Sequence, residues 1–160
     1  MRVGRTDTLS NRDKMKRMNE QQIDELVAAA ENARANAYAP YSGFAVGAAV
    51  MTDDGRVFVG CNVENASYGL GVCAERHAVG AAVAAGCRTF VGLAVVTAAS
   101  PPAAPCGACR QVLAEFGDFP VVLANSDNVR KTTSVGRLLP SAFDRDTLDR
   151  AREAVRRGGS

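Results

Sequence analysis

The fold and function of this chain are decided by Cys73-Ala74-Glu75-Arg76 and by Pro105-Cys106-Gly107-Ala108-Cys109. Together the two motifs supply three thiols and one carboxylate. A structural zinc site is normally closed by four protein ligands, whereas a catalytic zinc site keeps one position open for water. Three cysteines with one nearby glutamate fit the catalytic kind, so we predict that Cys73, Cys106 and Cys109 bind Zn²⁺.

Each motif lies at the start of a predicted helix, over residues 73–85 and 107–116. A helix N-terminus presents unpaired N–H groups and a partial positive charge, which favour a thiolate over a thiol. Because Cys106 and Cys109 are three residues apart, their sulfurs are expected on one face of the first turn. The placement at helix starts therefore helps several thiolates to coexist.

Glu75 is separated from the ligand Cys73 by a single residue. A metal-bound water loses a proton far more readily than bulk water, and a carboxylate within hydrogen-bond reach can move that proton. A lone glutamate in a first helical turn more often only complements the helix dipole. Beside these cysteines, we interpret Glu75 as the catalytic general acid and base. Three thiolates leave zinc with a net negative charge, and we hypothesise that Arg76 compensates it by hydrogen-bonding to ligand sulfurs.

The cysteine content argues against a disulfide framework. The chain has five cysteines, an odd number, and nothing in it points to export. A lone pair of cysteines spaced like Cys106 and Cys109 could also form a structural zinc site or a redox pair. The remaining two, Cys61 and Cys87, are interpreted as small buried apolar residues.

Hydrophobic periodicity and turn signals predict an α/β protein. The order of the elements implies a hairpin followed by helical crossovers, and so a three-layer α/β/α sandwich with a mixed, mainly five-stranded sheet. The expected helices span residues 19–37, 73–85, 107–116 and 146–157, and the expected strands span residues 44–51, 56–62, 90–97, 121–124 and 132–135.

The composition provides enough apolar residues for a hydrophobic core, and the net charge is too small to create a strong electrostatic field. Of its 160 residues 47% are hydrophobic, and its formal net charge is +2. Residues 1–18 are basic and expected to be a disordered leader, residues 19–143 the catalytic domain, and residues 144–160 a C-terminal helix and tail. The most apolar run is interrupted by Arg88 and several glycines, so it does not predict a membrane span. We expect a cytoplasmic protein with neither nucleic acid nor membrane as partner.

The two motifs also match a known pattern, that of the zinc-dependent nucleobase deaminases, which has a three-cysteine variant. Over residues 19–143 the chain resembles a cytidine deaminase of the small, homotetrameric, three-cysteine type. The resemblance implies zinc-dependent hydrolytic deamination of cytidine and deoxycytidine to uridine and deoxyuridine, in pyrimidine salvage. The matching stretches are residues 38–44, 60–68, 73–76, 105–112 and 138–143.

The resemblance also assigns substrate contacts. Asn62 and Glu64 would hold the ribose hydroxyls, since residues two apart at the end of a strand point to the same side. Phe44 would stack on the pyrimidine, and Tyr68 and Ala74 would line the pocket. Taken by themselves, such aromatic residues are more often part of a core.

Two further residues are informative: Phe143 bears on the assembly of the protein, and His77 departs from the family pattern. Phe143 resembles the aromatic residue that reaches into a neighbouring subunit's site, which would make the protein a homotetramer with shared sites. His77 replaces the threonine that the resemblance leads one to expect. It lies four residues after Cys73, but Cys106 and Cys109 already complete the ligand set, so we expect His77 to pack behind the site.

Two alternatives remain. The protein could deaminate a nucleoside-like compound such as blasticidin S, although residues 62–66 follow the plain nucleoside pattern. It could also be a non-catalytic zinc-stabilised module, but such a module has no need of Glu75. Editing of polynucleotides is disfavoured, because no basic or aromatic-rich groove is evident.

Overall fold

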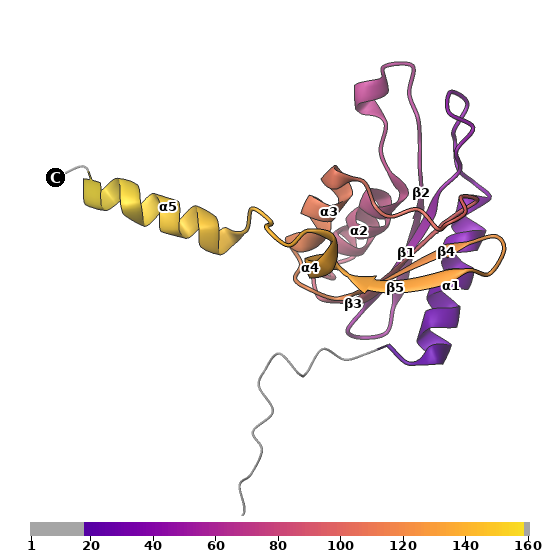
Figure 1. Ribbon diagram of the computed structural model, residues 1–160, viewed down its shortest axis with the longest axis horizontal. Helices are drawn as coiled ribbons and strands as arrows, with labels where there is room; N and C mark the ends of the chain where they lie inside the picture. Colours follow the sequence, from indigo (N-terminus) through magenta and orange to yellow (C-terminus); the bar gives the residue numbers. More distant parts are fainter. Residues whose placement is uncertain (1–17, 159–160) are drawn as a thin grey trace, which may run out of the picture.

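The computed structural model describes residues 18–158, which form a five-stranded mixed sheet flanked by helices (Figure 1). The strand order is β2-β1-β3-β4-β5, and every neighbouring pair is antiparallel except β3 and β4. The strands are β1 (Gly47–Thr52), β2 (Val57–Cys61), β3 (Phe90–Thr97), β4 (Pro120–Asn125) and β5 (Arg130–Ser134). The predicted mixed sheet is confirmed.

Helices cover both faces of this sheet. Helix α1 lies on one face, and α2 and α3 lie on the other, which confirms the predicted three layers. Short helices were not predicted: the 3₁₀ turn η1 and α4 carry no long periodic pattern. The helices are α1 (Glu20–Arg34), η1 (Tyr68–Leu70), α2 (Ala74–Ala84), α3 (Gly107–Ala114), α4 (Val135–Leu138) and α5 (Arg145–Gly158).

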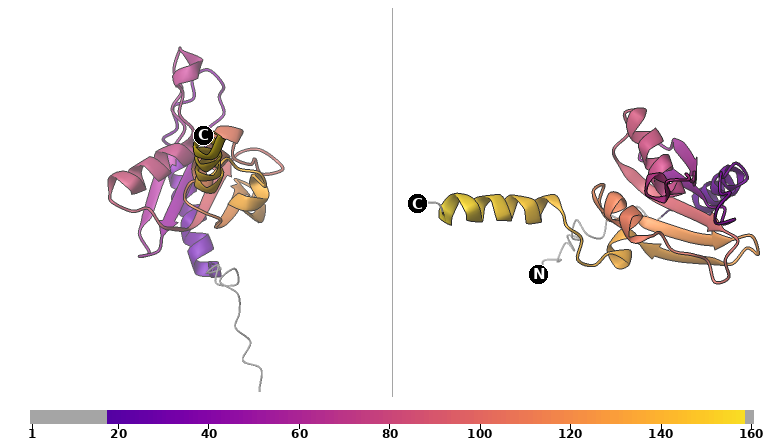
Figure 2. Two further views of the ribbon diagram at one scale, coloured as in Figure 1. Left: turned by 90° about the vertical axis from the view of Figure 1, so that its left-hand side faces the viewer. Right: turned by 90° about the horizontal axis from the view of Figure 1, so that it is seen from above.

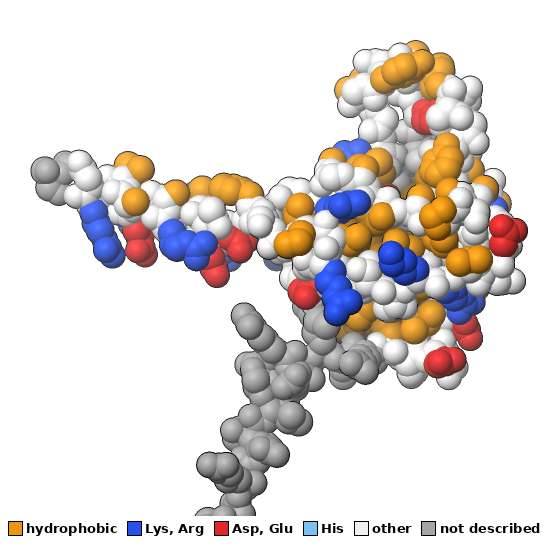
Figure 3. Space-filling view, viewed as in Figure 1, with side chains coloured by type: hydrophobic (Ala, Val, Ile, Leu, Met, Phe, Trp, Pro, Cys, Tyr) orange, Lys and Arg blue, Asp and Glu red, His pale blue; other side chains and the backbone are white. Residues whose placement is uncertain are grey.

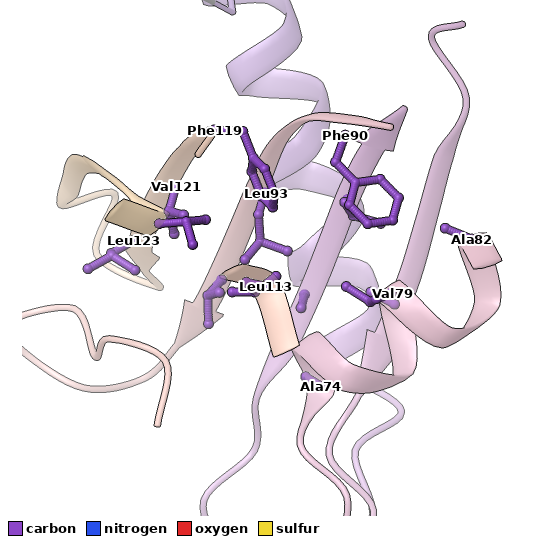
Figure 4. Packing of buried hydrophobic residues seen from close by; sticks show 14 of the residues in the cluster. Ala74, Val79, Ala82, Phe90, Leu93, Leu113, Phe119, Val121 and Leu123 are labelled. Atoms are coloured by element: carbon purple, nitrogen blue, oxygen red, sulfur yellow. The ribbon is translucent and has the colours of Figure 1, made fainter. Parts of the chain in front are cut away.

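The core has two parts, one on each face of the sheet. Alternate residues of a strand point to opposite faces, so in β1 Val50 packs on the α2 side and Met51 on the α1 side. Leu93 and Leu113 fill the space between the sheet and helices α2 and α3 (Figure 4). A sheet buried on both faces reads as a continuous apolar run, as β1 and β3 do.

Two parts of the chain project from this body. The segments of residues 35–46 and 62–73 form an arm, held together by bridges of Val63 to Tyr38 and to Val72 (Figure 1). Helix α5 extends away from the sheet in a different direction from the arm and buries no residue (Figure 2). Its charged side chains lie along one edge in Figure 3.

Three sequence expectations need comment. Met18 was assigned to the leader, but it is buried against the α1-side core, and residues 1–17 lie outside the described part. Cys87 is buried as predicted. The same prediction was wrong for Cys61, which is only half-buried at the end of β2, with its Sγ 3.5 Å from the carbonyl oxygen of Asn36.

Helix α2 approaches the sheet closely because β2 contains Gly60. A Cβ at Gly60 would lie 2.4 Å from the carbonyl oxygen of Ala74, in the first turn of α2. We predict that Gly60→Ala lowers the free energy of unfolding by about 2–3 kcal/mol, because the clash is with rigid backbone. Denaturant unfolding measures the change.

The matched control is Gly80→Ala in α2. Gly80 has open space where a Cβ would lie, so this substitution should gain about 0.5–1 kcal/mol from its helical position. If the two variants had equal stability, close packing of α2 on β2 would not be the reason for Gly60.

Candidate active site

Three sulfur atoms converge where α2 and α3 begin. The Sγ atoms of Cys73 and Cys106 are 3.8 Å apart, those of Cys106 and Cys109 are 3.5 Å apart, and all three lie within 4.8 Å of one another. Zinc–sulfur bonds of about 2.3 Å in tetrahedral geometry require sulfurs about 3.8 Å apart. The three ligands predicted from the sequence therefore fit a zinc ion.

The cluster forms because all three cysteines lie at the N-terminal ends of helices α2 and α3. Cys73 is the N-cap residue of α2 and Cys106 that of α3, and Cys109 follows within the first turn of α3. The N-terminal ends of both helices favour negative charge. Burial, together with the nearby Glu75 carboxylate, raises the pKa of the Cys109 thiol. Because metal ligands must be deprotonated, zinc binding would have to displace this proton.

Glu75 is a buried carboxylate beside the sulfurs, with only 4% of its surface exposed. Its position in the first turn of α2 is the one predicted. Burial raises its pKa above the ordinary value of a glutamate. A raised pKa suits a group that must both accept and release a proton near neutral pH.

Arg76 contacts the cluster as hypothesised from the sequence. Its Nη2 lies 3.6 Å from the Sγ of Cys73 and 3.4 Å from the carbonyl oxygen of Gly71. Its Nε is buried without a hydrogen-bond partner. A guanidinium next to a sulfur ligand is placed to offset negative charge on that sulfur.

His77 lies outside the sulfur cluster, as expected. Its Nδ1 is 2.8 Å from the carbonyl oxygen of Cys61 at the end of β2. Among residues 18–158, the group that could hold a metal ion consists of the three cysteines. His77 therefore links α2 to the sheet behind the site.

The side chains of Asn62 and Glu64 connect the two segments of the arm, a role that the sequence did not reveal. The Asn62 amide accepts a hydrogen bond from the Val46 N–H at 2.8 Å and donates one to the Phe44 carbonyl at 2.8 Å. One Glu64 oxygen accepts the N–H groups of Tyr41 and Ser42, at 2.9 and 3.1 Å. The other accepts the Ser42 hydroxyl, and this bond chiefly lowers the pKa of Glu64.

A cavity of about 260 Å³ lies in the arm, and its lining includes none of the three cysteines. Sequence reasoning found two of its residues, Glu64 and Tyr68, but overlooked Ser42, which lies inside a matching stretch. Four of its lining residues were not assigned to the site; the lining consists of Tyr41, Ser42, Glu64, Asn65, Tyr68 and Gly71.

The other predicted contacts lie in different environments. Phe44, Tyr68 and Phe143 have 43%, 79% and 60% of their surface exposed. Ala74 is fully buried in the core, so only its backbone could contact a substrate. The segment that carries Phe143 is tied to α3, because Gln111 donates to the Phe143 carbonyl at 2.7 Å.

An α/β/α fold with a three-sulfur zinc cluster and an adjacent buried carboxylate defines a zinc-dependent hydrolytic deaminase. Residues 20–125 match the model of the cytidine and deoxycytidylate deaminase zinc-binding region. With more than half of the chain matched in this way, the protein belongs to the cytidine and deoxycytidylate deaminase family.

Similar proteins agree with this assignment. The chain is 47% identical to a cytidine deaminase of Sporosarcina psychrophila over 133 residues, which cover 82% of this chain and 98% of that protein. A cytidine deaminase of Mycobacterium tuberculosis is 48% identical over 123 residues, or 77% of this chain and 90% of the relative. The crystal structure of a Burkholderia pseudomallei cytidine deaminase superposes with a TM-score of 0.74 at 55% identity, covering 79% of this chain and all of that one.

Zinc binding should depend on Arg76. We predict that Arg76→Ala lowers zinc affinity about tenfold, since groups that contact metal ligands typically have effects of that size. Competition with a chromogenic chelator measures the affinity. Arg88→Ala, at an exposed arginine beyond the end of α2, is the control and should bind zinc like the wild type. An Arg76→Ala protein with unchanged zinc affinity and turnover would disprove charge compensation.

Proposed function

We propose that this protein hydrolyses cytidine and deoxycytidine to uridine and deoxyuridine with release of ammonia. The observation that carries the proposal is Glu75, which is buried and in contact with Cys109, one of three cysteines whose sulfurs fit a zinc ion. The relatives named as cytidine deaminases, which align over about four fifths of the chain, support the same substrate class.

The chemistry replaces the amino group on C4 of the pyrimidine by the oxygen of water. When bound, zinc acts as a Lewis acid that makes this water easier to deprotonate. Glu75 takes one proton from the water and delivers it to N3 while the oxygen bonds to C4. It then takes the second proton from the hydroxyl now on C4 and gives it to the departing amine, as the C4–N bond breaks and the carbonyl forms. One water enters and one ammonia leaves, so Glu75 ends the cycle in its starting state.

The proposed contacts to the base and the ribose come from residues of the arm. Phe44 stacks on the pyrimidine, and Asn62 and Glu64 hold the ribose hydroxyls. An ionised carboxylate offers about four acceptor positions, and the arm occupies three on Glu64. The Asn62 amide has one N–H and one lone pair in use. Both groups therefore retain capacity to bind a sugar.

The site is shared between subunits of a homotetramer in this proposal. Tyr68 and Phe143 are more than half exposed, and an assembly would bury such apolar surface. Tyr68 and the backbone of Ala74 line the pocket, and Phe143 enters the site of a neighbouring subunit. Residues 19–143 constitute the catalytic domain, with residues 1–18 as a leader and 144–160 as an appended helix and tail.

The cell compartment proposed is the cytoplasm, with a role in pyrimidine salvage. Three clustered thiols without a disulfide suit a reducing environment. Among residues 18–158, no helix is both long and apolar enough to cross a membrane.

Turnover should depend on Glu75 while zinc binding does not. We predict that Glu75→Ala and Glu75→Gln retain zinc but lose at least about a hundredfold in kcat, since each lacks a group that can transfer the proton. The change in ultraviolet absorbance of cytidine, deoxycytidine and blasticidin S measures turnover, and zinc is quantified in the same samples. Wild-type rates in either variant would remove Glu75 from the mechanism. Turnover by the wild type of blasticidin S alone would overturn the proposed substrate.

Mixed assemblies test the shared site. One subunit carries Phe143→Ala and the other Glu75→Ala, so each type alone has a defect in every site. If Phe143 crosses to a neighbour, hybrids carrying two different purification tags should be more active than either parent, because some Glu75 sites receive an intact Phe143. Activity no higher than that of the Phe143→Ala parent, in hybrids verified by mass, contradicts the crossing.

A further inference from the structure

The segment that carries Phe44 has no regular secondary structure, so side chains fix its shape. Gly43, with φ 66°, turns the chain between Ser42 and Phe44. The Phe44 N–H donates to the Ser42 hydroxyl at 3.0 Å, and the Phe44 carbonyl accepts from the Asn62 amide at 2.8 Å. Both polar backbone groups of Phe44 are therefore held by side chains.

The Ser42 hydroxyl has a second partner in Glu64. A hydroxyl has one proton to donate, and because the Phe44 N–H is itself a donor, this proton goes to the Glu64 carboxylate. One oxygen atom thus joins the group proposed to hold the sugar to the residue proposed to stack on the base.

The Ser42 hydroxyl can be removed while other hydrogen bonds still connect the two segments of the arm. The N–H groups of Tyr41 and Ser42 donate to the other Glu64 oxygen, and these bonds come from the backbone. The Glu64 N–H donates to the Tyr38 carbonyl at 2.8 Å. Loss of the hydroxyl alone leaves these connections between the two sides of the arm.

We propose that Ser42 is a positioning residue for nucleoside binding, which aligns the Glu64 carboxylate and Phe44 with each other through its hydroxyl. The inference rests on the proposed function, because it assumes that Phe44 and Glu64 bind the nucleoside. Ser42 lines the cavity of the arm together with Glu64. Its removal leaves the zinc cluster and Glu75 in place, so it should affect substrate binding rather than the chemical step.

The test is the separation of KM from kcat. For Ser42→Ala we expect KM for cytidine to rise about tenfold, because both hydrogen bonds of the hydroxyl are lost and each has a modest net contribution. We expect kcat to stay within about twofold of the wild type. Zinc content and the unfolding midpoint should not change. Ser42→Thr keeps the hydroxyl and should restore KM to within about threefold of the wild type.

Ser67→Ala is the matched control. Ser67 lies in the same arm, and its side chain makes no capping hydrogen bond to η1, so this variant should have wild-type KM. A second readout is the pair Ser42→Ala and Glu64→Gln: because Ser42 acts partly through Glu64, the double variant should have a smaller effect than the two single effects multiplied.

Each contrary result has a distinct meaning. An unchanged KM in Ser42→Ala, or a Ser42→Thr variant as impaired as Ser42→Ala, overturns the positioning role. A joint change of kcat, KM and unfolding midpoint also overturns it, since it indicates a structural role only. Failure of the wild type itself to deaminate cytidine would instead overturn the proposed function.

Discussion

The close contact between α2 and β2 is the constraint on which the site depends. Ala74 lies between Cys73 and Glu75, and its carbonyl occupies the space that a side chain at residue 60 would need. A larger residue on either surface would move the start of α2 outward. That movement would separate one sulfur and the carboxylate from Cys106 and Cys109. The relative positions of the three sulfurs and the Glu75 carboxylate thus depend on close backbone contact between α2 and β2.

Strand directions bring the second half of the site to the same place. Both β2 and β3 are antiparallel to β1, so they run in the same direction. The chain leaves β2 through the arm to enter α2, and it leaves β3 to enter α3. Both helices therefore begin at the same edge of the sheet, beyond the carboxyl ends of the strands, where α/β proteins commonly bind ligands. Two motifs far apart in the sequence meet because of this topology.

The parts of the structure that follow from local pattern were predictable from the sequence. Strand β3 has the predicted bounds, and α2 begins after Cys73 because apolar periodicity and a turn signal define them. The hydrogen bonds of Asn62 and Glu64 were not predictable, since they join residues up to 23 positions apart and leave no periodic trace. Side-chain bonds also explain why β1 begins at Gly47 and not at Phe44: the Ser42 hydroxyl and the Asn62 amide, not a neighbouring strand, hold the Phe44 peptide. Residue types identified the metal site, whereas only the fold shows how the arm is held.

The electrostatics of the site explain why its parts occur together. Three thiolates and the Glu75 carboxylate carry four negative charges, and a zinc ion with Arg76 supplies three positive ones. Each of the two helix N-termini adds a partial charge equivalent to about +0.5, which brings the total close to zero. Removing any one of these partners leaves a charge uncompensated in a partly buried place, which is costly. When Glu75 takes up a proton, the site departs from this near neutrality by one positive unit, and it returns to neutrality when Glu75 releases the proton.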